Sequence, residues 1–146
     1  MEQVNQQTTK TNKVKLDFKN SKYATGRRKR SIAKVWVKKG SGNIHVNGMK
    51  MNEYFKRPVH QIIVTRPLEI SEVASNYDVK CSVKGGGLSG QAGAIILGIS
   101  KALISHDENL KKNLKKDKLT TRDSRVVERK KYGHRKARRS FQFSKR

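Results

Sequence analysis

Val79-Lys80-Cys81-Ser82-Val83-Lys84, followed by Gly85-Gly86-Gly87 and an apolar stretch that runs to Ser105, decides the fold of this chain. The alternation predicts a strand whose inner face carries Val79, Cys81 and Val83. Beyond the glycines, apolar residues recur at the spacing of one helix face. They are Leu88, Ala92, Ile95, Ile96, Ile99, Ala102 and Leu103. We therefore predict a strand, a glycine turn and a long core helix, with the single cysteine as a small core residue.

Two more strands are predicted on the N-terminal side. Residues 31–39 alternate in polarity, with Ala33, Val35 and Val37 on one face. Gly40-Ser41-Gly42-Asn43 reads as a turn, after which Ile44 and Val46 alternate with polar residues. This pattern predicts a β-hairpin between residues 31–39 and 44–46.

Helices are expected in three further places. Met49 to Phe55 could form one or two turns, and Leu110 with Leu114 indicates a short helix. Ser105-His106-Asp107-Glu108 has the spacing of a capping box for that helix. Pro67 suits the first turn of another helix, whose apolar positions would be Ile70, Val73, Ala74 and Tyr77. The fold class is α+β, and pattern alone leaves the order of the strands open.

Composition divides the chain into three parts. Residues 1–22 are polar and are expected to be a disordered extension, 23–120 a globular body, and 121–146 an extended basic tail. Residues 129–146 contain nine Lys and Arg and no acid. A segment with so little apolar surface cannot offset its ordering entropy by burial, so we expect a polyanion to order it.

The charge balance points to nucleic acid. With 35 Lys and Arg against 11 Asp and Glu, the chain has a formal net charge of +24, and the phosphate backbone is the obvious counter-charge. No run of 18 apolar residues is present, and the first residues lack the apolar stretch of a secretory signal. An anionic membrane surface is the other candidate partner, but the basic segments have no facing apolar stripe.

The glycine run resembles nucleotide-binding loops only superficially. Gly85 to Gly90 fits G-x-G-x-x-G, but Gln91-Ala92 stands where a phosphate-binding loop needs Lys and Ser or Thr. The acids at Asp107 and Glu108 look like a helix start rather than the strand end of a dinucleotide site. Two readings stay open for these glycines: backbone amides that hold an RNA phosphate, and a tight turn with close packing.

No arrangement of side chains indicates catalysis or a metal. The four histidines lack ligand spacing, and the acids form no pair for acid–base work. We expect no enzyme activity and no cofactor. Basic residues are instead interleaved with Tyr23, Tyr132, Phe141 and Phe143, whose rings could stack on unpaired bases. For the two phenylalanines, plain packing against the protein or against RNA sugar edges is the slightly preferred reading.

Five segments in order and spacing resemble one family. They are Tyr23–Ala33, Ile44–Gly48 with Tyr54-Phe55, Val83–Ala94, Leu119–Gly133, and Arg135–Arg139 continuing into Gln142–Arg146. Together they are similar to the ninth protein of the small ribosomal subunit, in its bacterial and organellar form. The resemblance implies a four-stranded sheet with helices on one face and a left-handed βαβ crossover. It also implies binding to small-subunit ribosomal RNA in the head, beside neighbouring head proteins.

The resemblance assigns roles to individual residues. Those expected to bind ribosomal RNA are Arg27, Arg28, Lys29, Arg30, Lys84, Gly86, Gly87, Ser89, Gln91, Arg122, Arg125, Arg129, Lys130, Lys131, Arg135, Lys136, Arg138 and Arg139. Ser144, Lys145 and Arg146 are expected to contact the tRNA in the peptidyl site. No membrane and no small-molecule substrate is implied. The ribosome would be that of a bacterium or of an organelle, with a mitochondrion preferred over a plastid. A free RNA chaperone is the alternative within the RNA-binding class.

Overall fold

The computed structural model describes residues 18–145. The elements are β1 (Lys22–Arg28), β2 (Ser31–Lys39), β3 (Ile44–Val46), β4 (Met49–Lys50), α1 (Met51–Tyr54), α2 (Pro58–Ile70), β5 (Tyr77–Lys84), α3 (Leu88–His106) and α4 (Leu110–Lys116). This arrangement confirms the α+β class. Most of the predicted N-terminal extension, residues 1–17, lies outside the described residues, as does Arg146 of the predicted tRNA contact.

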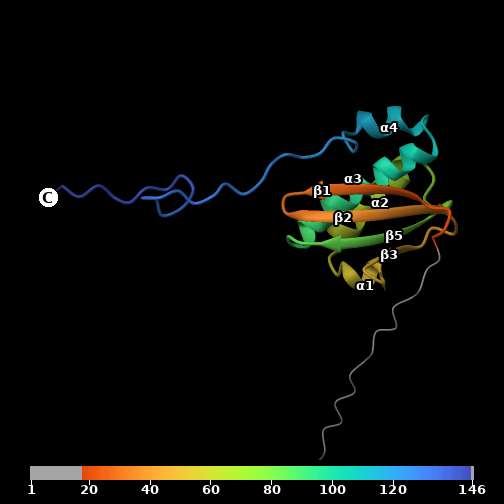
Figure 1. Cartoon of the computed structure of the whole chain (residues 1–146), viewed down its shortest axis with the longest axis horizontal. Helices are drawn as coiled ribbons and strands as arrows, with labels where there is room; N and C mark the ends of the chain where they lie inside the picture. The colour runs from red at the N-terminus through yellow and green to blue at the C-terminus, as the bar shows by residue number, and fades with distance from the viewer. Residues whose placement is uncertain (1–17, 146) are drawn as a thin grey trace, which may run out of the picture.

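The strands form one sheet in the order β1-β2-β5-β3-β4 (Figure 1). β2 pairs antiparallel with both β1 and β5, whereas β3 pairs parallel with β5. The predicted hairpin of residues 31–39 with 44–46 is therefore wrong, because alternation specifies which face of a strand is buried but not which strand lies beside it. The parallel β3–β5 pair, joined through α1 and α2, is a βαβ unit, and its left-handedness stays a prediction.

The expected strand count of four is also wrong, since the described sheet has five strands. The additional strand, β4, follows a two-residue turn at Asn47-Gly48, where φ is 52° and 85°. Asn47 fixes this turn to β5: its Oδ1 accepts from the Val83 amide at 2.8 Å, and its Nδ2 donates to the Val83 carbonyl at 3.2 Å. Asn-Gly is the commonest pair in such turns, so this signal was present in the sequence.

The helix expected after Pro67 instead ends near it. α2 begins at Pro58, whose fixed φ suits the first turn, and Pro67 lies in its last part. The residues that α2 buries are His60, Val64, Pro67 and Leu68, at the spacing of one helix face. Tyr77, assigned to the predicted helix, opens β5. Two prolines compete as helix starts, and only packing against α3 selects the first.

α3 is the centre of the core. It packs along β1, β2 and β5 on one side and against α2 on another, and Figure 1 shows the strands crossing in front of both helices. By length and mean hydropathy this helix could cross a bilayer, and 61% of its apolar window is buried inside the body. Val79, Cys81 and Val83 face it from β5, as predicted. Leu88, predicted to be part of the apolar stripe, is 45% exposed because it lies at the solvent-facing N-terminal end.

Close approach between α3 and the sheet depends on glycines. A Cβ at Gly26 of β1 would collide with the Ala94 carbonyl oxygen and lie 2.6 Å from the Gly98 amide nitrogen. The short helix α4 forms where predicted, but the capping box does not. Ser105 is inside α3 and donates to the Lys101 carbonyl, and the N-cap of α4 is Asn109, which makes no side-chain cap bond.

Candidate nucleic-acid interface

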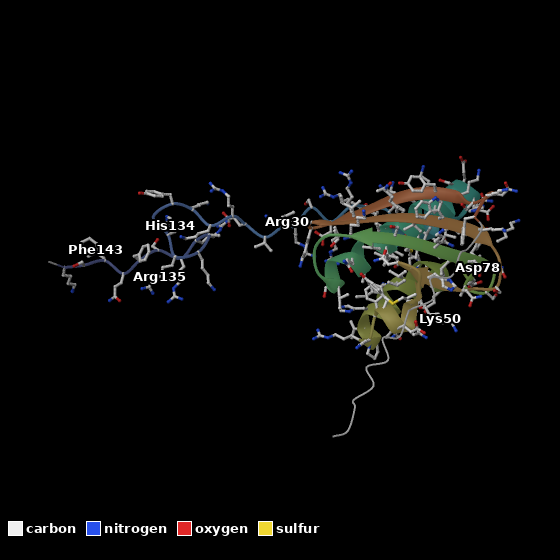
Figure 2. All side chains as sticks on the ribbon, turned by 60° about the horizontal axis from the view of Figure 1, so that its bottom comes forward. Arg30, Lys50, Asp78, His134, Arg135 and Phe143 are labelled. Atoms are coloured by element: carbon white, nitrogen blue, oxygen red, sulfur yellow. The ribbon has the colours of Figure 1, made fainter. Side chains whose placement is uncertain are left out.

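One end of the body gathers the first group of predicted RNA-binding residues, which we call the basic apex: the turn Arg27–Arg30 and the loop Lys84–Ser89. Arg27 and Arg28 belong to β1, rather than preceding the first strand as expected. Lys29 stands at the tip of the β1–β2 turn with φ of 51°. Ser31 Oγ donates to the Gly85 carbonyl at 3.0 Å, which joins the turn to the loop. Figure 2 shows Arg30 at the end of the body from which the tail departs.

The glycine loop supports both open readings, at different residues. Gly85 and Gly86 have φ of 75° and 62°, and a Cβ on Gly86 would collide with Ser31 Oγ. These two glycines are required by the turn and its packing. Gly87 has open space around its Cβ position and exposed backbone, so a phosphate could approach it. The tight turn thus presents the N-terminus of α3 to solvent.

A hollow lies at that helix end. Its lining includes Lys29 and Arg57 with Gly87 and Leu88. The amides of the first turn of a helix carry partial positive charge, and the two cations add to it. Arg57 was missed by the sequence argument. The signal that could have found it is Pro58, which marks Arg57 as the residue before a helix.

Two predicted contact residues are already engaged within the protein. Gln91 Oε1 accepts from the Tyr54 hydroxyl at 2.7 Å, and its Nε2 donates to the Gly85 carbonyl at 3.2 Å. Ser89 Oγ is 3.0 Å from His60 Nε2. These bonds hold the loop against α1 and α2. An RNA contact by Gln91 or Ser89 would have to use the hydrogen-bonding capacity that these bonds leave free. We therefore expect the two side chains chiefly to shape the site.

An acid fixes the root of the tail to the basic apex. Asp123 Oδ2 pairs with Arg28 at 3.1 Å and with Arg125 at 2.8 Å. The hydrogen bonds from the side chain and backbone of Arg125, together with the charge of Arg28, hold the pKa of Asp123 well below its usual range. Asp123 thus neutralises part of two predicted phosphate contacts and sets the direction in which the tail leaves.

Beyond this root the tail runs away from the body as an extended chain with one small loop (Figure 1). The loop is closed by a bridge between His134 and Ser140 and by the Arg135 amide, which donates to the Arg139 carbonyl at 2.8 Å. Glu128 pairs with Arg138 at 2.8 Å and Lys131 at 2.9 Å, and these bonds lower its pKa. The loop gives the tail a local shape without any packed core.

The other tail cations face solvent. Across residues 18–145, the structure places no acid in ion-pair range of the following exposed side chains: Arg122, Arg129, Lys130, Arg135, Lys136 and Arg139. Arg135 lies over the Phe141 ring, 5.4 Å from its centroid, and Phe143 is 86% exposed. Figure 2 shows His134, Arg135 and Phe143 far from the body. Neither phenylalanine packs into the core, so packing against the body does not account for them.

The body and tail together present exposed cations suited to phosphates on a folded scaffold. The described residues contain no group of three potential metal-ligating side chains. Comparison with known families agrees with this arrangement, because the family model described as ribosomal protein S9/S16 matches residues 26–146. The chain therefore belongs to the ribosomal protein S9/S16 family, whose members are structural proteins of the small ribosomal subunit that bind its RNA and act in translation.

Proposed function

We propose that the body docks on ribosomal RNA of the subunit head through the basic apex while the tail reaches the tRNA in the peptidyl site. We keep the three parts predicted from the sequence: residues 1–22 form an extension, 23–120 form the RNA-binding body and 121–146 form the tail. The residues assigned to ribosomal RNA above would position the protein by phosphate contacts. The ribosome would be bacterial or organellar.

The observation that carries the proposal is the tail, which leaves the body as an exposed extended chain (Figure 1). Its unpaired cations can each displace counterions from RNA, and that release offsets the cost of ordering the segment. The tip, Ser144, Lys145 and Arg146, would then bring two cations to the tRNA backbone. Phosphate contacts carry no base information, so the tip would hold different tRNAs alike.

The test compares two variants in reconstituted small subunits. One lacks residues 144–146. The matched control carries Lys115→Gln and Lys116→Gln, which removes two positive charges from α4 instead. Both should sediment with the subunit through a moderate-salt wash, because the apex and most of the tail are intact. Only the truncated chain should release tRNA faster from programmed subunits. Unchanged dissociation at both physiological and low salt would falsify the role of the tip.

A further inference from the structure

Among residues 18–145, no helix covers the face of the sheet opposite α3, where the centroid of the Phe18 ring lies 5.8 Å from Lys80 Nζ. The side chains of this face are not those of a plain solvated surface. In β2 and β5 the buried residues alternate with outward-facing ones, and β1 buries Gly26. The buried side chains of these strands pack against α3. The outward set of these strands contains cations and two aromatic rings. It includes one acid, Asp78, at the edge far from Arg30 (Figure 2).

Strand register brings the rings together. Tyr23 is paired with Trp36, and Trp36 with Lys80, so the three side chains form a row across the sheet. The centroids of the two rings are 5.3 Å apart with planes at 44°. Lys80 Nζ lies 6.0 Å from the Trp36 centroid. Tyr23 is 50% exposed at the end of the row, which leaves its ring available to an incoming base.

A hollow adjoins this row. It is lined by Ile32, Lys34, Ser82 and Lys84. Two lysines, one isoleucine and one serine thus line the hollow, and Lys34 lies two residues along β2 from Trp36. The alternation of ring, cation and hydroxyl on one flat surface offers stacking and phosphate contacts within the length of a few nucleotides.

Charge decides what kind of partner fits. Asp78 stays a carboxylate, because the backbone amides of Ser41 at 3.0 Å and Asn43 at 2.8 Å donate to its Oδ1 and stabilise the charged form. It lies at the other end of the strands from Lys34 and Lys84, so it leaves those two cations unpaired with it. The remaining surface is positive and calls for an anion. An acidic polypeptide would match the charge but would leave the rings without stacking partners, whereas an unpaired RNA strand satisfies both.

We propose that the open sheet face binds an unpaired RNA strand, with a base stacked on Tyr23 against Trp36 and phosphates held by Lys34 and Lys84. The inference rests on the RNA-binding function proposed above but assigns it a second surface, distinct from the hollow at the start of α3 and from the tail. Lys34 and Trp36 become RNA-contacting residues, which the sequence pattern alone does not single out, and Tyr23 gains a stacking partner in Trp36.

Trp36 makes the proposal directly measurable, because it is the single tryptophan of the sequence. The experiment titrates the full chain with an excess of a short oligoadenylate and follows the tryptophan emission. In parallel, the anisotropy of a labelled oligonucleotide reports RNA binding anywhere on the chain. We expect the emission to change with single-stranded RNA and to change far less with an RNA duplex of equal phosphate number.

Three variants sharpen the result. Lys34→Gln removes one phosphate contact and should weaken the emission-detected binding about fivefold at 0.1 M salt. Tyr23→Leu keeps the apolar bulk but removes the stacking ring, and should weaken it by at least about fivefold. Lys112→Gln removes a charge from the exposed side of α4 and should leave the emission response unchanged. Circular dichroism checks that each variant is folded.

Three outcomes would overturn the proposal. The first is an unchanged emission at RNA concentrations where the anisotropy has saturated, which would reject the sheet face but leave RNA binding intact. The second is an equal response to duplex RNA or to polyglutamate, which would reject the unpaired strand as the occupant. The third is the absence of any anisotropy change, which would reject both this surface and the RNA-binding function on which it rests.

Discussion

Gly26→Ala should destabilise the body strongly, because β1 and α3 approach each other more closely there than a methyl group permits. The new Cβ would lie 2.6 Å from the Gly98 amide nitrogen and collide with the Ala94 carbonyl oxygen. Both are helix backbone atoms, so no side-chain rotation relieves the contact. Restoring an ordinary separation of about 3.4 Å from the Gly98 nitrogen alone requires the strand and helix to part by about 0.8 Å, and the closer Ala94 oxygen requires more.

The magnitude follows from that separation. A gap of this size forfeits a quarter to a half of the dispersion energy across the affected contact, and overpacking typically costs about 1–3 kcal/mol. We expect about 3 kcal/mol, the upper end, because the clash is between backbones. That is a large fraction of the roughly 5–15 kcal/mol that stabilises a typical domain. For a body of this size it corresponds to a fall in Tm of about 12–24 °C.

Thermal unfolding followed by far-ultraviolet circular dichroism measures the effect. Gly87→Ala is the matched control, because its Cβ meets open space and its backbone, with φ of −107° and ψ of 171°, suits any residue. That variant should lose less than about 1 kcal/mol, the cost of alanine at an N-cap. A Gly26→Ala chain whose Tm lies within about 4 °C of the parent would refute the argument that this glycine sets the strand–helix distance.

Three other outcomes are expected. Arg125→Gln should raise the pKa of Asp123 toward its usual value, and carboxyl NMR titration of the parent and the variant measures the two pKa values. In the parent chain the ion pairs of Asp123 add stability at neutral pH, and this stability is lost as the pH falls through the lowered pKa. Replacing Arg129, Lys130 and Arg135 by Gln should reduce the slope of log Kobs against log salt for single-stranded RNA by about 2. Lys131→Gln should change the slope by less than each of those three charges does, because Glu128 already pairs with Lys131. Equal changes in slope per charge removed would contradict this expectation. Cys81 should resist alkylation in the folded chain and react on unfolding, because burial raises the pKa of its thiol; rapid labelling of the native protein would exclude the buried position.

Much of the architecture could be predicted from the sequence. The period-two alternation around Cys81 and the helical spacing from Ala92 to Leu103 are strong local signals, and both elements form as predicted. The acid-free tail was readable as an extended segment because burial cannot order it. The residues of the basic apex were predicted to bind RNA from their charge density and from the resemblance to the family, not from their geometry.

Other features depended on contacts between distant segments. The alternation of buried and exposed residues around Val35 is the same whichever strands lie beside β2. The sequence pattern therefore could not show that β1 and β5, rather than β3, are its neighbours. Pro67 lies inside α2, although proline by itself favours a helix start, so local preference pointed to the wrong position. Nothing local indicates that Asp123 pairs with Arg28, 95 positions away, or that Gln91 is held by Tyr54.

By itself, the sequence determined which faces are buried and where the long core helix runs, and it predicts that a polyanion orders the basic tail. These properties depend on periodicity and composition, which are local. Only the tertiary structure decided which strands pair, which glycines serve packing and which leave room for a phosphate. It also placed Tyr23 and Trp36 side by side on the open face of the sheet. Side-chain proximity across strands arises from register, and register is set by the whole packed body rather than by any one segment.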